Sequence, residues 1–134
     1  EASRAALAQP EYLKPIPIEH AMPSTFDKGL DTADVLNSLR TLMVRKLGIV
    51  REPQQLDEAL STVNFWCRYV LAHEFDSKVG WELQNLLVVA RLIIDAARRR
   101  TESRGTHFRS DYPARRDAEW LNQHLTSPPV TQFL

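Results

Sequence analysis

The feature of this sequence that most constrains its fold is an apolar stripe between residues 53 and 71. Its members recur every three or four residues: Leu56, Ala59, Leu60, Val63, Trp66, Cys67, Val70 and Leu71. This spacing places them on one face of a helix. Glu52-Pro53 precedes the stripe, and proline is favoured at the first helical position. The sequence therefore predicts an amphipathic helix whose apolar face needs partner helices.

A second helix is predicted before this one. Asp31 or Thr32 can cap its start, and we expect Gly48 to close it in a left-handed conformation. Its apolar stripe consists of Val35, Leu36, Leu39, Leu42, Met43 and Leu47.

A third helix is predicted from about Trp81 to about Arg100, after a turn over residues 75–80 and before a stop at Gly105. Its first apolar stripe consists of Leu83, Leu86, Leu87, Ala90, Ile93, Ile94 and Ala97. A second strip beside it consists of Val89, Leu92 and Ala96. A helix that is apolar on more than one face is covered on more than one side, so we expect a neighbouring domain to contribute to its cover.

These helices define the predicted fold. No strand pattern of useful length is present, and a short fourth helix around Trp120 is predicted for residues 118–125. We predict an all-α fold: an antiparallel three-helix bundle with an extended N-terminal linker and a short C-terminal helix. Residues 1–30 hold four of the eight prolines and read as a linker from an upstream domain, whereas 31–134 form the helical domain. The chain starts without methionine, so we expect it to be a piece of a longer protein.

Composition excludes several classes of function. Seventeen basic and seventeen acidic residues cancel, which argues against a nucleic-acid or membrane partner. The single cysteine, Cys67, excludes a disulfide framework, suits a reducing, cytoplasmic location, and is expected to be a packed thiol. The three tryptophans are likewise expected in the core.

No catalytic, metal or cofactor motif is found in the chain. The four glycines stand far apart, so neither a dinucleotide fingerprint nor a phosphate loop exists. His73-Glu74 begins like a zinc-protease helix, but Ser77 replaces its second histidine. We therefore expect no catalysis, cofactor or metal binding by this chain alone, and a colourless purified protein.

Residues 98–116 contain seven arginines and only two acids. One interpretation is a solvated helix end, where cations favour the negative end of the helix dipole. Interleaved His107, Phe108 and Tyr112 allow an RNA-binding interpretation, against which the neutral overall charge argues. A third interpretation follows from the order of the residues: Glu102, Ser103, Arg104, Gly105, His107, Arg109, Asp111, Tyr112 and Pro113.

This order resembles a signature of the flavoprotein family of L-aspartate oxidases, succinate dehydrogenases and fumarate reductases. The resemblance extends upstream through residues 82–87 and downstream to Trp120 and His124, and it covers about residues 31–125. Within the family, Leu42-Met43 and Gly48-Ile-Val-Arg51 look most like L-aspartate oxidase.

The resemblance implies that the parent protein is an FAD enzyme. It would pass a hydride from L-aspartate to the flavin and give iminoaspartate, which quinolinate synthase condenses on the way to NAD. The FAD-binding and capping domains would supply the catalytic residues and be partners of this helical C-terminal domain. Two alternatives stay open: the same domain of a succinate dehydrogenase or fumarate reductase, and a free-standing helical adaptor.

The signature residues have an expected physical role. Gly105 allows a sharp turn, Glu102 can pair with Arg104 or Arg109, and Asp111 can accept from backbone amides or His107. The loop is then braced within this domain, docked on the flavin domain, or in contact with substrate through Arg104 or His107. The sequence leaves these three possibilities open.

Overall fold

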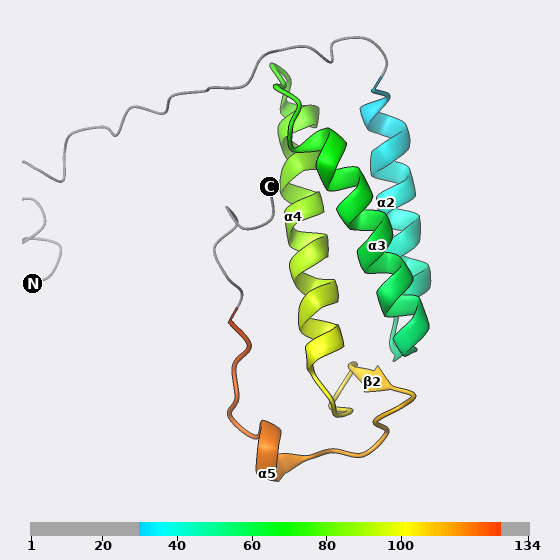
Figure 1. Ribbon diagram of the computed structural model, residues 1–134, viewed down its shortest axis with the longest axis vertical. Coiled ribbons are helices and arrows are strands. Elements are labelled where there is room, and N and C mark those ends of the chain that lie inside the picture. Colours follow the sequence, from blue (N-terminus) through cyan, green and yellow to red (C-terminus); the bar gives the residue numbers. More distant parts are fainter. Residues whose placement is uncertain (1–29, 127–134) are drawn as a thin grey trace, which may run out of the picture.

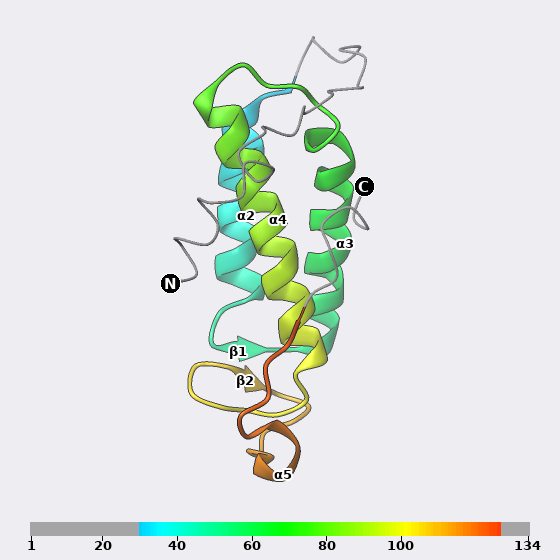
Figure 2. The ribbon, with the colours of Figure 1, turned by 90° about the vertical axis from the view of Figure 1, so that its left-hand side faces the viewer.

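Three antiparallel helices form the body of the protein. The computed structural model describes residues 30–126, so nearly all of the predicted linker lies outside the described part. Helices α2 (Thr32–Lys46), α3 (Pro53–Val70) and α4 (Lys78–Arg99) lie side by side, and the chain reverses direction between each pair (Figure 1, Figure 2). This arrangement confirms the predicted three-helix bundle.

The helix starts follow from local capping. The carboxylate of Asp31 accepts from the amides of Ala33 and Asp34 at 2.9 and 3.1 Å, and Pro53 opens α3 as predicted. Ser77 caps α4, which therefore begins three residues before Trp81, and the predicted turn over residues 75–80 is wrong in its second half.

Residue 80, in the first turn of α4, is a glycine because the Phe75 side chain packs against its backbone. A Cβ atom at this position would lie 2.2 Å from the Phe75 ring. The glycine in this segment therefore permits a close packing contact, whereas the sequence pattern indicated a turn.

The core is formed where the three stripes meet. Its fully buried members are Leu56, Ala59, Val63, Leu83, Leu87 and Ile94. Cys67 is 4% exposed, and burial raises the pKa of its thiol, which confirms the prediction of a packed cysteine. Trp81 is not in the core: its side chain is 54% exposed, and its indole donates to the Phe75 carbonyl at 2.6 Å.

One flank of α4 is not covered within the described residues. Leu86, Val89 and Ile93 are 39%, 49% and 44% exposed, and helical spacing aligns them on one line. We call these three residues the α4 flank. Leu86 and Ile93, which the sequence places in the first apolar stripe, lie on its exposed edge, because the buried face of α4 is centred on Leu83, Leu87 and Ile94. Leu92 and Ala96 are half-buried.

The glycine predictions at helix ends require correction. Helix α2 closes through the amide of Leu47, which donates to the Met43 carbonyl, and Gly48 does not have a positive φ. Helix α4 ends at Arg99, well before Gly105. The predicted fourth helix is only one turn, α5 (Asp117–Trp120).

A two-residue parallel pairing was not predicted. Strand β1 (Val50–Arg51) lies between α2 and α3, and strand β2 (Phe108–Arg109) lies in the loop after α4. The amides of Phe108 and Ser110 donate to Ile49 and Arg51 carbonyls, both at 3.1 Å. The pairing fixes the loop across one end of the bundle (Figure 2).

Among the described residues, none of the helices is long and apolar enough to cross a bilayer.

Candidate functional site

The loop after α4 contains a tight two-residue turn. Arg104 and His107 exchange both backbone hydrogen bonds, at 2.8 and 3.0 Å, and Gly105 and Thr106 connect them. Gly105 has φ +58°, and Thr106 does not have a positive φ. This combination fits a type II′ turn, in which glycine occupies the first central position. The positive φ at Gly105 therefore belongs to this turn.

Glu102 is the electrostatic centre of the loop. Its side chain has no exposed surface, yet two guanidinium groups and one amide contact it. Arg104 donates to both carboxylate oxygens at 2.8 and 2.9 Å, and Arg100 donates twice to Oε1 at 2.9 and 2.6 Å. These bonds, above all those from Arg104, lower the pKa of Glu102 to about 2. The sequence analysis offered Arg104 or Arg109 as the partner of Glu102, and of these two the structure shows Arg104.

Arg109 connects the loop to the end of α4. It is 4% exposed, and its Nη1 donates to the carbonyls of Ala97 and Arg98 at 2.8 and 2.9 Å. Its other edge forms a two-point ion pair with Asp111 at 2.8 and 2.7 Å. The guanidinium satisfies helix carbonyls that would otherwise lack donors. Asp111 thus pairs with Arg109 rather than with His107, and the pKa of Asp111 is lowered chiefly by this pair.

Ser103 holds the two sides of the loop together. Its hydroxyl accepts from the Arg109 amide at 2.8 Å and donates to the Tyr112 carbonyl at 2.8 Å. Its own amide donates to the Ala114 carbonyl at 3.2 Å. Pro113 and the 37% exposed Tyr112 lie on the outside of this loop.

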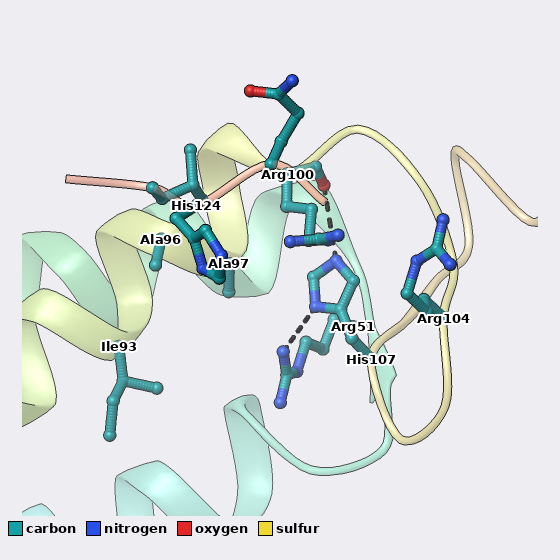
Figure 3. A pocket seen from close by; sticks show the side chains of 10 residues that line it. Arg51, Ile93, Ala96, Ala97, Arg100, Arg104, His107 and His124 are labelled. Carbon is teal, nitrogen blue, oxygen red and sulfur yellow. Dashed lines mark hydrogen bonds between the residues drawn. The ribbon is translucent and has the colours of Figure 1, made fainter. Parts of the chain in front are cut away.

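His107 lies between two arginines. Arg51 Nη1 is 2.5 Å from its Nδ1, and its Nε2 is 3.3 Å from the Arg100 carbonyl (Figure 3). Because a guanidinium only donates, Nδ1 is assigned as the acceptor and Nε2 carries the hydrogen. Burial lowers the pKa of His107, and the charges of Arg51, Arg109 and Arg100 lower it further. We therefore assign the neutral imidazole at pH 7.

A pocket of about 500 Å³ opens beside this histidine. Its polar lining comes from Arg51, Arg100, Arg104, His107 and His124, and its apolar floor from Ile93, Ala96 and Ala97 of α4 (Figure 3). The wall is electropositive, with hydrogen-bond donors above an apolar floor. Such a pocket can bind an anion. Among the described residues there is no cluster of side chains suited to a metal ion.

Sequence reasoning missed three residues of this site. Arg51 was noted only as part of a sequence resemblance, Arg100 as a helix end, and Arg116 only as one of the seven arginines of residues 98–116. Their roles depend on the β1–β2 pairing and on a buried carboxylate that accepts the Arg116 amide at 3.0 Å. The available signal was Glu102 itself, since it is one of only two acids among seven arginines and can attract several of them.

The comparisons with known proteins agree on one family. The profile described as "Fumarate reductase flavoprotein C-term" matches residues 36–132. The fumarate reductase flavoprotein subunit of Helicobacter pylori is 33% identical over 76% of this chain and 16% of its own length. L-aspartate oxidase of Rhodospirillum rubrum is 37% identical over 73% of this chain and 32% of its own length.

A solved structure shows the same likeness. A chain of the Mycobacterium smegmatis Sdh1 complex in the apo form matches with a TM-score of 0.56 and 29% identity, over 84% of this chain and 18% of that chain. The protein thus spans a third or less of the relatives that it matches. It belongs to the family of fumarate reductase flavoprotein C-terminal domains, the helical part of flavoproteins that include L-aspartate oxidases and succinate dehydrogenases.

Proposed function

We propose that this chain is the C-terminal helical domain of an FAD-dependent L-aspartate oxidase, with a structural role and no catalysis of its own. The observation that carries the proposal is the position of Arg51. It ends the Gly48–Arg51 segment that resembles L-aspartate oxidase, and its guanidinium contacts the signature His107. The 37% identity to the Rhodospirillum rubrum enzyme supports the same reading.

The contacts within the loop support a structural role. Arg104 is bonded to Glu102 and to Asp117, the latter at 2.6 Å, and these bonds raise its pKa. Both ring nitrogens of His107 are also occupied. Residues that acted directly on substrate would have to give up these bonds. The bracing is therefore consistent with a loop that shapes a surface.

The described residues do not fit a flavin. Binding of a dinucleotide needs a glycine cradle in which the backbone approaches phosphate closely. A Cβ atom at Gly48 or Gly80 would instead meet Val44 or Phe75 of this chain, and one at Gly105 would stand in open space. We therefore assign no FAD-binding residue here and expect the parent's FAD-binding domain to hold the cofactor.

The α4 flank supports a docking role. Leu86, Val89 and Ile93 form an exposed apolar line, which suits packing against the FAD-binding or capping domain of the parent chain. A cytoplasmic location, and quinolinate synthase as a pathway partner, belong to the same proposal.

The test uses the full-length protein that contains this chain. It is purified with its flavin and mixed without oxygen with L-aspartate or with succinate, and the visible flavin absorbance is recorded. We expect L-aspartate to bleach the flavin and succinate to leave it oxidised. Reduction by succinate alone would reject the L-aspartate oxidase assignment and leave the family membership intact.

A second candidate is the same domain in a fumarate reductase or succinate dehydrogenase. It is favoured by the 33% identity to the Helicobacter pylori subunit and by the likeness to the Sdh1 complex. The same flavin experiment decides between the two candidates. L-aspartate and succinate differ by one amino group, and each candidate is expected to have its flavin reduced by its own substrate.

A further inference from the structure

Arg51 is the arginine of the site that lacks a negative partner among the described residues. Each of the other arginines around the loop is paired with a carboxylate: Arg100, Arg104, Arg109, Arg115 and Arg116. Arg51 instead donates to two neutral acceptors, the Gly48 carbonyl at 3.0 Å and the His107 ring. Its positive charge is therefore not balanced within this part of the chain.

The environment of Arg51 makes this charge costly. The side chain is half-buried, and burial together with the nearby charge of Arg109 lowers its pKa. Strand pairing places these two arginines directly opposite each other. A buried charge without a partner is destabilising, and an anion that reached it would relieve the cost.

The pocket provides access to this charge. Arg51 lines it together with His107 and His124, above the floor formed by α4. Its Nε and Nη1 atoms have acceptors, which leaves Nη2 as the donor with no bond among the described residues. Arg100 stands on the other side of His107 and can add a second interaction (Figure 3).

We propose that this pocket binds a carboxylate group, with Arg51 as its main contact. A carboxylate carries one negative charge, which balances the one uncompensated arginine, and its two oxygens suit a planar guanidinium. The apolar floor accommodates the carbon atoms attached to the group. The carboxylate is that of a small free acid or of an acidic side chain from another protein segment. This site goes beyond the proposed structural role and does not depend on it.

The test is an NMR titration of the ¹⁵N-labelled 134-residue chain at constant ionic strength, with chloride as the reference anion. The two probes are sodium propionate, a free acid with one carboxylate and a short apolar chain, and the capped peptide acetyl-Gly-Glu-Gly-amide, which presents one side-chain carboxylate. We expect saturable shifts of the Arg51 Nε–H and the His107 ring signals. A response to propionate alone identifies a small free acid, a response to the peptide alone identifies a protein side chain, and responses to both support an open carboxylate site.

Variants assign the site to Arg51. Arg51→Gln is expected to weaken binding at least about tenfold, and Arg51→Lys, which keeps the charge without the fork, by less. Arg40→Gln, on the exposed surface of α2, is the matched control and is expected to bind normally. The wild-type titration decides the proposal even where a variant fails to fold. The absence of a saturable shift with either probe overturns it.

Discussion

Glu102 and Arg104, separated by one residue in sequence, form a two-point ion pair at a carboxylate with no exposed surface. Arg104 is the first residue of the tight turn and only Ser103 separates it from Glu102, so the short backbone between the two residues sets the geometry of the pair. Arg100 and the amide of Arg116 occupy the remaining positions around the same carboxylate. The loop is therefore organised around one buried acid.

The first prediction concerns this acid. Because the pKa of Glu102 falls from 4.5 to about 2 on folding, its stabilisation is complete above pH 4.5 and is lost as the pH falls toward 2. Glu102→Gln should lower the denaturant midpoint at pH 7, and the difference from wild type should shrink at pH 3. Glu74→Gln, at an exposed position, is the control. A difference that does not vary with pH would contradict the assignment.

The second prediction concerns His107. Its pKa lies below the usual 6.5, so the folded state holds it neutral where the unfolded state is protonated. Its contribution to stability is present above pH 6.5 and is lost as the pH falls below that value. We expect its ring NMR signal to titrate below pH 6.5, and Arg51→Gln to raise the midpoint. A midpoint above 6.5 in the wild type would be incompatible with the neutral assignment.

The third prediction concerns Gly105. No atom lies within 4 Å of the position of an added Cβ, so the cost of a side chain comes from the φ of +58° alone. Gly105→Val should destabilise the chain by about 1–2 kcal/mol. Thr106→Val, one residue further, should change stability by no more than about 0.5 kcal/mol. Thermal unfolding of both variants measures the difference, and equal midpoints would argue against the turn.

The fourth prediction compares two neighbours on α4. Ile94 has no exposed surface, whereas Ile93 on the α4 flank is 44% exposed. Ile94→Glu should cost at least about 4 kcal/mol or prevent folding, because it buries an unpaired charge. Ile93→Glu should be tolerated by this chain and should weaken assembly of the full-length protein. Circular dichroism and gel filtration check both, and unfolding of Ile93→Glu would place that residue in the core.

The helices could be predicted from the sequence because their signals are local. Asp31 and Pro53 each favour the start of the helix turn that follows them. The apolar stripe through Leu56 and Val63 is likewise set by residues only three or four positions apart. The start of α4 was missed because Gly80 looks like a turn residue until Phe75 is seen against it.

The site was less predictable because its contacts join distant segments. The signature offered Arg104 or Arg109 as partners of Glu102, of which the structure shows the local one, Arg104, but it did not indicate the contact of Arg51 with His107. That contact depends on a two-residue strand pairing, which is too short to leave a pattern of alternating polarity. The exposure of Ile93 was missed for a related reason, since periodicity does not tell which flank of a helix its partners cover.

The β1–β2 pairing has a consequence for the order in which the protein folds. Its two hydrogen bonds join residues on either side of α3 and α4, so they close a long stretch of chain for little local gain. The α3–α4 hairpin is more local and can form first, which brings Arg51 and Arg109 into reach of each other. The loop after α4 would then be the last segment to become ordered. The amides of Phe108 and Ser110 report this directly, since their hydrogen exchange can slow only after the end of the bundle has closed.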